Sequence, residues 1–350
     1  MRGLYIYPEC YSDAFGGFVD YFRFYQDSAN FEIFCIASDI LLSDGNPYAI
    51  PIGKDIWDKD IPQILSTLGK FDFVIYAGRI ECFPQIYGQI EDVKKKKMGY
   101  IFDYINKMNC PVILYALDES IYFNEILEQF EVKQENIKAV FAVEPKVYQN
   151  IPTKIPFFYM PPHFEHRIIP HIKSFVFGEK PEVIFRGAIP PNTFRFKFLD
   201  DLSKLQLSIP LDIGDYMLPD SKFFKSRNTW NEMSQRRFVL SIPGNLNMMI
   251  NRRIFGSIGS GKVLLSFDER SEMFRDLKQD WFFPPNEWFV HKESALFFKT
   301  PEEAASLINE YYQNEHELKR IWENGHKLLC KYHMPWHRAQ KFISLIRQVL

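Results

Sequence analysis

A chain of 350 residues is longer than one hydrophobic core usually organises, so two domains of ordinary size are expected. Hydrophobic residues make up 46% of it and charged residues 25%, which excludes a disordered or fibrous protein. Residues 1–170 carry 16 basic against 23 acidic residues and residues 171–350 carry 26 against 21, so the second half is the better host for an anion. No apolar run is long enough to span a membrane, no signal-peptide pattern occurs, and the five cysteines lack metal-ligand spacing, so we expect a cytoplasmic protein.

Strands and helices alternate through the first half of the chain. The expected strands are short continuous apolar runs, which are typical of strands buried on both faces of a parallel sheet. They cover residues 4–7, 31–37, 71–77, 111–117 and 139–143, and the expected helices cover residues 18–25, 61–68 and 98–108. This alternation predicts a doubly wound α/β domain over residues 1–160.

A proline-rich connector, residues 151–170, is expected next, because proline lacks the backbone donor that helices and central strands need. The alternation then resumes and predicts a second domain over residues 161–335. Its expected strands cover 183–185, 211–213, 238–242 and 262–267, with a turn at 186–187, and its expected helices cover 194–205, 251–259, 301–312 and 315–332. Thr300 and Glu303 have the spacing of a helix-capping box. A last helix, within residues 336–350, is a candidate to pack back on the first domain.

A strand–helix–strand unit over residues 238–267 gathers polar groups at its strand ends, where open α/β sheets bind ligands. Arg252 and Arg253 stand at the entrance of its helix, where the helix dipole already favours an anion. Asp268 and Glu269 follow its second strand. We therefore expect a diphosphate site here, and an ordinary strand–helix–strand unit with surface arginines is the alternative.

The order and spacing of these pieces resemble the GT-B class of sugar-nucleotide-dependent glycosyltransferases over nearly the whole chain. The resemblance is carried by the segments VIFRGAIPPNTFRFKFL and NRRIFGSIGSGKVLLSFDE and by the helical tail ending YHMPWHRAQ. Within that class the chain is similar to the bacterial spore-coat-type transferases and to the phage DNA β-glucosyltransferases. The resemblance implies two doubly wound Rossmann-like domains facing each other across a cleft, the first binding the acceptor and the second binding the nucleotide sugar.

The resemblance also implies the residues of the donor site. Gly187 and Arg195 stand where the phage enzymes have a glycine-containing turn and an arginine that contacts the diphosphate, and Arg253 stands where they have an arginine opening a helix. Gly256 departs from the glutamate with which many GT-B enzymes hold the ribose, so another acid substitutes for it or the nucleotide is gripped differently. The expected donor-binding residues are Arg186, Gly187, Arg195, Arg252, Arg253, Gly256, Asp268 and Glu269.

The catalytic base of the phage enzymes is a carboxylate at the end of a first-domain strand, and Asp118 stands in that context in CPVILYALD, with Asp13 as a second candidate. The expected acceptor-binding residues are Gly16, Gly17, Glu119 and His163. The glycine pair also fits a tight turn, and the histidine fits a structural role at the hinge. Transfer needs arginine forks on the leaving diphosphate and a base on the acceptor hydroxyl. No metal ion is required if the arginines neutralise the diphosphate.

Other residues of the expected site have structural alternatives. Asp118 has the position of a helix N-cap, since it follows a strand and precedes an expected helix. Arg195 fits a solvated helix surface equally well, and Arg186 fits an ion pair with a neighbouring acid. Arg252 and Arg253 are adjacent, so they face different directions and only one is expected to point at a ligand.

Three functions remain open at this point. The leading one is transfer of a hexose, glucose from UDP-glucose with inversion, onto a hydroxymethylated base of phage-type DNA, in the host cytoplasm if the chain is phage-encoded. The acidic first half counts against it, because DNA affinity usually needs a basic face. The alternative acceptor is a cell-surface glycan or another saccharide. The third function is a nucleotide- or glycan-binding module without turnover, which the residue Gly256 favours.

Overall fold

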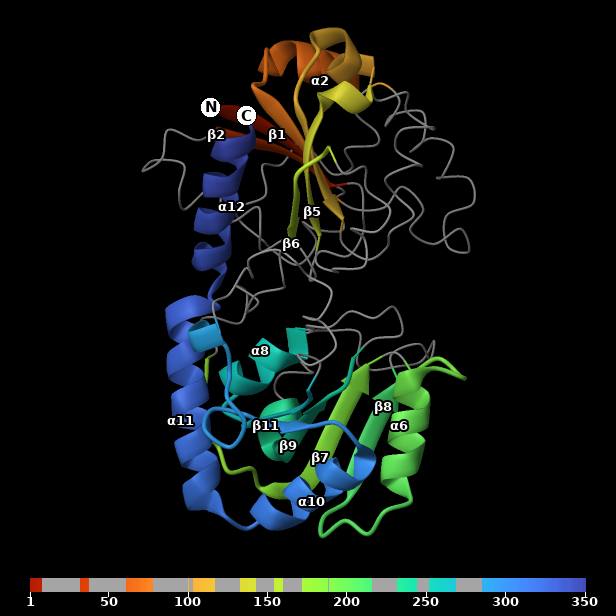
Figure 1. Ribbon diagram of the computed structural model, residues 1–350, viewed down its shortest axis with the longest axis vertical. Helices are drawn as coiled ribbons and strands as arrows, with labels where there is room; N and C mark the ends of the chain where they lie inside the picture. The colour runs from red at the N-terminus through yellow and green to blue at the C-terminus, as the bar shows by residue number, and fades with distance from the viewer. Residues whose placement is uncertain are drawn as a thin grey trace. The chain divides into compact units, whose positions relative to one another are not determined.

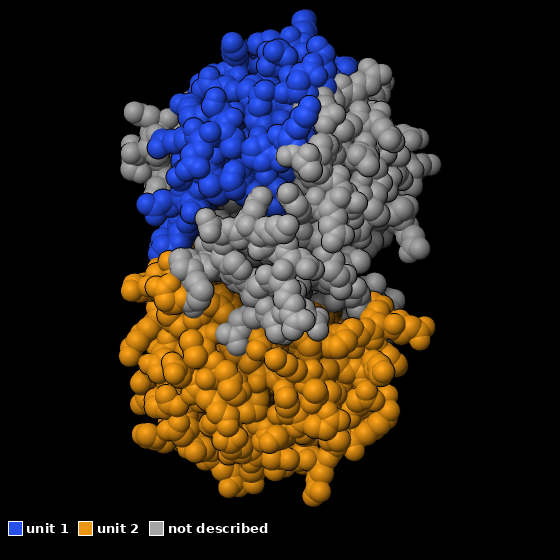
Figure 2. Space-filling model, in the orientation of Figure 1, with its two compact units in different colours: residues 1–160, 336–350 blue, residues 161–335 orange. Residues whose placement is uncertain are grey.

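The computed structural model (Figure 1) describes residues 1–7, 32–37, 61–77, 100, 103–116, 133–142, 154–159, 172–187, 189–215, 232–243, 252–268 and 285–350. The chain divides into two compact units (Figure 2). Unit 1 comprises residues 1–160 and 336–350, and unit 2 comprises residues 161–335. Among the described residues, no helix is both long enough and apolar enough to cross a membrane.

Unit 1 is built on a six-stranded sheet with the strand order β2-β1-β3-β4-β5-β6, in which all neighbouring strands are parallel. The strands are β1 (Arg2–Tyr7), β2 (Glu32–Ala37), β3 (Phe73–Ala77), β4 (Val112–Ala116), β5 (Ile137–Ala142) and β6 (Phe157–Tyr159). Helix α2 (Ile61–Leu68), a helical segment at 103–108 and a 3-10 helix at Gln134–Asn136 lie between them in the chain. Successive residues such as Val74 and Ile75, or Val112 and Ile113, are completely buried, as expected for a sheet covered on both faces.

Helix α12 (Pro335–Val349) completes the core of unit 1 from the far end of the chain. The ring of Phe342 lies edge-on to Phe141 on β5, with centroids 4.4 Å apart, and 6.0 Å from the ring of Tyr115 on β4. Phe342 and Ile346, one helical turn apart, are both completely buried. The helix therefore buries an apolar stripe against the sheet.

Unit 2 is built on a five-stranded parallel sheet with the order β11-β10-β9-β7-β8. Its strands are β7 (Lys180–Gly187), β8 (Leu211–Asp215), β9 (Arg236–Ser241), β10 (Leu264–Phe267) and β11 (Leu296–Phe298). Its helices are α6 (Phe194–Ser203), α8 (Arg252–Gly259), α10 (Pro301–Tyr311) and α11 (Glu315–Tyr332), with a 3-10 helix at Pro285–Glu287. Two parallel sheets with crossover helices are the Rossmann-like α/β architecture predicted from the sequence.

Side-chain caps determine where the helices of unit 2 begin. Thr193 accepts a hydrogen bond from the backbone N–H of Phe196 at 3.2 Å and so caps α6. Thr300 caps α10 by accepting from the N–H of Glu303, and the Glu303 carboxylate accepts from the N–H of Lys299 at 2.7 Å. This reciprocal pair closely follows the expected capping box. Both capped helices begin shortly after the carboxyl end of a strand: α6 follows β7, and α10 follows β11.

The connections of unit 2 reverse direction between β7 and β9. From β7 the chain passes through α6 to β8 on one side, and from β9 it passes through α8 to β10 on the other side. Adjacent strands whose connections depart in opposite directions leave a crevice at their carboxyl ends, where open α/β sheets bind ligands. Gly187 ends β7, and Ile242 follows β9 at this point.

Three local expectations were wrong. The turn expected at 186–187 is the end of β7, where Arg186 pairs with Gly214 and Gly187 pairs with Asp215 of β8, because strand pairing extends the strand beyond its apolar run. Strand β6 lies inside the expected connector at the sheet edge, where the carbonyl of Pro156 accepts from the N–H of Val140 at 2.9 Å. Strand β11 was not expected, since three residues are too short a run to stand out.

Candidate functional site

Arg253 is held at the carboxyl edge of the unit 2 sheet by a ring and a carbonyl. Its guanidinium carbon lies 4.8 Å from the centroid of the Phe185 ring, and Nη1 donates to the carbonyl of Ile242 at 3.3 Å. Gly187 makes this position possible, because a Cβ atom at 187 would lie 2.8 Å from Nη2 of Arg253. The guanidinium therefore occupies space that a side chain at the end of β7 would fill.

Arg195, the second residue of α6, reaches the same place from a different helix. Nη2 donates to the carbonyl of Ile242 at 3.2 Å, Nε donates to the carbonyl of Pro243 at 3.0 Å, and the guanidinium carbon lies 5.5 Å from the Phe185 ring centroid. Arg195 is only 5% exposed, so the solvated helix surface considered from the sequence is wrong. Arg195 and Arg253 thus meet at one carbonyl, beside one aromatic ring.

This arrangement concentrates positive charge at the crevice between β7 and β9. Both arginines stand in the first turn of a helix, where backbone N–H groups lack helical partners and the dipole is positive. The carbonyl of Ile242 orients both guanidinium groups toward this edge. An anion with several oxygens, such as a diphosphate, is the ligand that such a place suits best.

Arg186, by contrast, points to the opposite face of β7, because side chains alternate along a strand. Its Nη2 lies 2.8 Å from the carboxylate of Asp212 and 2.6 Å from that of Glu232, and its Nη1 donates to the carbonyl of Phe185 at 3.0 Å. Burial lowers the pKa of the Arg186 guanidinium, but the hydrogen bonds to Glu232 and Asp212 outweigh burial and raise it overall. The same contacts hold the pKa of Asp212 below its usual range. The ion pair considered from the sequence is the contact that Arg186 makes, so we omit it from the donor site.

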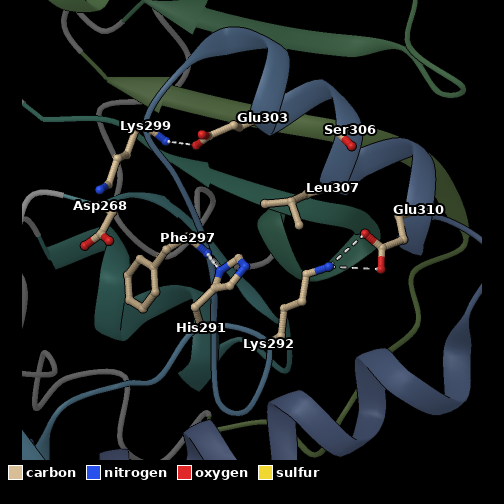
Figure 3. Close-up of a pocket in the computed structure, with 9 residues that line it drawn as sticks. All are labelled: Asp268, His291, Lys292, Phe297, Lys299, Glu303, Ser306, Leu307 and Glu310. Atoms are coloured by element: carbon tan, nitrogen blue, oxygen red, sulfur yellow. Dashed lines mark hydrogen bonds and ion pairs between the residues drawn. The ribbon is translucent and has the colours of Figure 1, made fainter.

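Asp268 directly follows β10 and lines a pocket of about 430 Å³ (Figure 3). Its backbone N–H donates to the carbonyl of Phe298 at 2.6 Å, which ties the ends of β10 and β11 together. The other lining residues are His291, Lys292, Phe297, Lys299, Glu303, Ser306, Leu307 and Glu310. Lys292 pairs with Glu310 at 3.1 Å at the end of the pocket away from Asp268. Sequence reasoning placed only Asp268 in the donor site. His291, Lys292, Phe297 and Lys299 lie in or beside β11, which it did not anticipate, and the other four lining residues belong to the expected helix α10.

The remaining expected residues fall into two groups. Gly256 is a buried residue in the middle of α8, and Arg252 begins that helix, its side chain lying outside the described part of the structure. The others lie outside the described residues: Asp13, Gly16, Gly17, Asp118, Glu119, His163 and Glu269. Within the described ranges, no group of three or more His, Cys, Asp and Glu side chains is arranged to hold a metal ion.

Comparison with known proteins relates this architecture to glycosyltransferases. Residues 218–344 match the family model described as glycosyl transferase-like. No curated protein sequence matches the chain.

Solved structures match the chain over almost its full length. An alpha-glucosyltransferase in complex with UDP-glucose and DNA containing an abasic site has 12% identity and a TM-score of 0.65, with 99% of each chain covered. An alpha-glucosyltransferase in complex with UDP and a 13-mer DNA containing a central A:G mismatch has 13% identity and a TM-score of 0.62, covering 99% of this chain and 100% of that one. Anabaena HepE in complex with UDP-glucose has 9% identity and a TM-score of 0.52, again covering 99% and 100%.

The resemblance drawn from the sequence is therefore confirmed at the level of the fold, which is that of GT-B glycosyltransferases. The family match over 218–344 and this fold together support a glycosyltransferase.

Proposed function

We propose that this chain transfers glucose from UDP-glucose and that unit 2 binds the diphosphate at the carboxyl edge of its sheet. The observation that carries the proposal is the convergence of Arg195 and Arg253 on the carbonyl of Ile242, beside Gly187. Guanidinium groups remain charged at any physiological pH and bind phosphate oxygens in pairs. The first turns of α6 and α8 add backbone N–H donors to the same place.

The chemistry expected of these groups is stabilisation of the leaving diphosphate. Negative charge grows on the phosphate oxygens as the bond to the sugar breaks, and donors already in position stabilise that charge without reorganising. Each such donor typically contributes about 2.7–4 kcal/mol to the transition state. Because two guanidinium groups bring two positive charges, we expect transfer to proceed without an added divalent ion.

The proposed catalytic base is Asp118, with Asp13 as the second candidate. Asp118 follows β4, whose described part ends at Ala116, and strand ends of this kind carry ligand-binding and catalytic groups in α/β folds. A carboxylate there would take the proton of the acceptor hydroxyl as that oxygen attacks the sugar. Glu119, Gly16, Gly17 and His163 stay proposed acceptor residues on the strength of the resemblance.

The leading acceptor is a hydroxymethylated base in DNA. Its support is the likeness to two alpha-glucosyltransferase structures that contain DNA. A saccharide acceptor is the second candidate, which the excess of acidic residues over residues 1–170 favours. UDP-glucose holds its sugar as the α-anomer, so the inversion that we propose gives a β-linked product. An α-linked product would mean retention and would overturn the proposed inversion.

Transfer of label from UDP-glucose to hydroxymethylated DNA tests the proposal, with unmodified DNA and a mixture of oligosaccharides as parallel acceptors. We expect label on hydroxymethylated DNA alone, its loss in Asp118→Asn, and release of the sugar by a β-glucosidase. Label on saccharides alone would replace the DNA acceptor with the second candidate. UDP that raises the melting temperature without any transfer would favour a binding module, and no effect of UDP on melting would overturn the diphosphate site.

A further inference from the structure

Phe194 is an exposed aromatic residue at the edge of the candidate site. It is the first residue of α6, directly before the buried Arg195, and it is 49% exposed. Its ring packs edge-on to Phe267 with centroids 5.2 Å apart and lies 5.8 Å from the ring of Phe198. These neighbours cover one side of the ring, and about half of the residue faces solvent.

The position of Phe194 links the two ends of the candidate donor region. On one side it adjoins Arg195, whose guanidinium lies at the crevice between β7 and β9. On the other side it packs on Phe267, the last residue of β10, which immediately precedes Asp268 of the pocket. The ring of Phe194 therefore lies between the arginine pair and the residue that precedes Asp268.

A cation accompanies the ring on the surface of α6. Lys197 is exposed and follows Phe194 by three positions, so the two side chains lie on the same side of the helix. Stacking aromatic rings combined with nearby positive charge is the combination with which proteins bind unpaired nucleic acid strands. A saccharide acceptor offers a ring for stacking but no backbone charge for Lys197 to bind.

We propose that Phe194 binds the acceptor by stacking its exposed ring on an unpaired base of DNA, while Lys197 binds a neighbouring phosphate. This inference rests on the proposed function, since it gives the DNA acceptor a place in unit 2. Loss of one stacked base from a protein–DNA contact weakens binding by about 5- to 150-fold. The donor is held through its diphosphate by other residues, so its affinity is expected to stay unchanged.

The helix supplies a matched control in Phe196. Phe196 is 44% exposed on the same helix, but two positions of helical rotation turn its side chain away from that of Phe194. Phe196→Ala therefore removes an equally exposed ring from the same helix turn. Phe194→Leu keeps an apolar side chain against Phe267 while removing the aromatic face, and Phe194→Trp restores that face.

The test measures binding of a fluorescein-labelled single strand of DNA carrying one hydroxymethylcytosine by anisotropy, and binding of UDP by calorimetry. We expect Phe194→Leu and Phe194→Ala to weaken DNA binding about 5- to 150-fold, Phe194→Trp to restore it, and Phe196→Ala to change it less than twofold. The dissociation constant for UDP should be the same in all four variants. Lys197→Ala should lower the salt dependence of DNA binding by about one ion.

Three results would overturn the inference, and they can be told apart. Equal DNA affinity in the Phe194 and Phe196 variants would remove Phe194 from acceptor binding while leaving DNA as the acceptor. Weaker UDP binding with unchanged DNA binding would mean that the ring stacks on the base of the donor. A native protein that transfers glucose to saccharides and does not bind DNA would overturn the DNA acceptor together with this inference, and the transferase activity would stand.

Discussion

Arg186 and Arg195 are both almost completely buried in unit 2, at 2% and 5% exposure, yet their acceptors differ. Arg186 lies between two carboxylates on the sheet, and Arg195 lies at the carboxyl edge and donates to backbone carbonyls. Burial alone therefore does not separate an arginine of an ion network from a candidate ligand-binding arginine.

A second pair of arginines repeats this contrast. Arg236, at the start of β9, lies 2.5 Å from the carboxylate of Glu182 and 3.1 Å from that of Asp212, on the same ion network as Arg186. Arg253 lies over a phenylalanine ring and donates to a carbonyl, as Arg195 does. The unit 2 sheet thus carries an ion network that joins Arg186 and Arg236 to three carboxylates, and a second pair of arginines at its carboxyl edge.

Arg186→Met removes one cation of the ion network, and we expect it to have the largest effect on stability. Among the described residues it leaves Arg236 as the cation beside the part-buried carboxylates of Asp212 and Glu232, so the free energy of unfolding should fall by about 3–5 kcal/mol. Urea unfolding measures the change. Lys204→Met, which breaks the exposed pair with Asp200, is the control and should leave the unfolding midpoint unchanged. A stable Arg186→Met protein that no longer binds UDP would reverse the assignment of the two arginine sets.

Arg253→Gln removes one guanidinium from the crevice between β7 and β9, and its effect should appear in catalysis. Removing one positioned donor to the leaving group should lower kcat/KM for UDP-glucose by roughly 10²–10³-fold while the unfolding midpoint changes little. Steady-state transfer kinetics measure the loss. Arg320→Gln, on the exposed surface of α11 where Arg320 pairs with Glu317, is the matched control and should retain full activity. Equal losses of kcat/KM in both variants would mean that donor binding depends on the overall positive charge of the protein and not on the arginines at the crevice.

Lys262 sharpens the comparison at the amino end of β10, because this buried lysine donates to the carbonyl of Val176. Burial, with a smaller contribution from the nearby Arg237 and Lys173, lowers its pKa to about 7. The unfolded chain then binds more protons than the folded one between pH 7 and about 10.4, so stability rises with pH across that window. Lys262→Met should remove this dependence.

The same substitution should stabilise the protein at neutral pH. One unit of pKa depression corresponds to about 1.4 kcal/mol, so we expect a gain of roughly 2–3 kcal/mol at pH 7 after the loss of the hydrogen bond. Urea unfolding at pH 7 and at pH 10 measures both quantities. Lys173→Met, which changes a less buried neighbour, should alter the slope much less. If the free energy of unfolding of the native protein did not change between pH 7 and pH 10, the lowered pKa of Lys262 would be contradicted.

Two glycines provide the smallest and most direct test, because each faces one arginine. A Cβ at Gly187 would meet the mobile end of Arg253, 2.8 Å from Nη2, whereas a Cβ at Gly214 would lie 2.7 Å from Cδ of Arg186. Gly187→Ala should weaken UDP binding about 10-fold by moving one guanidinium, with little loss of stability. Gly214→Ala presses on a side chain fixed by two carboxylates and should cost about 1–2 kcal/mol of stability with UDP binding intact. Calorimetry measures UDP binding, and urea unfolding measures stability, in both variants. A loss of stability in Gly187→Ala together with a loss of UDP binding in Gly214→Ala would refute the comparison.

The sequence predicted long elements well and short ones poorly. Helices α2 and α11 begin and end where the pattern of apolar residues and caps placed them, at 61–68 and 315–332. Strands β6 and β11 have three residues each, and such runs carry no period from which a strand can be recognised. Their place comes from pairing with β5 and β10, which only the folded chain provides.

The candidate site was predictable where the order of segments carried the information. Gly187, Arg195 and Arg253 were named from the sequence, and the structure brings them together. The surroundings of Arg186 were not predictable, because its two acidic partners stand 26 and 46 residues further along the chain. The sequence alone therefore does not show which arginine forms ion pairs, because the acids that pair with Arg186 are distant from it in the chain.

Helix α12 has a consequence for how the protein is made. The aromatic rings of Tyr115 and Phe141 contact Phe342, a residue that is synthesised about 200 positions after them. At ribosomal speeds of roughly 5–20 residues per second, the first sheet waits about 10–40 seconds for this cover while all of unit 2 is translated. All residues of unit 2 are therefore synthesised before the last residues of unit 1. A nascent chain paused before α12 should therefore engage chaperones through the uncovered face of its first sheet, although that sheet is translated earliest.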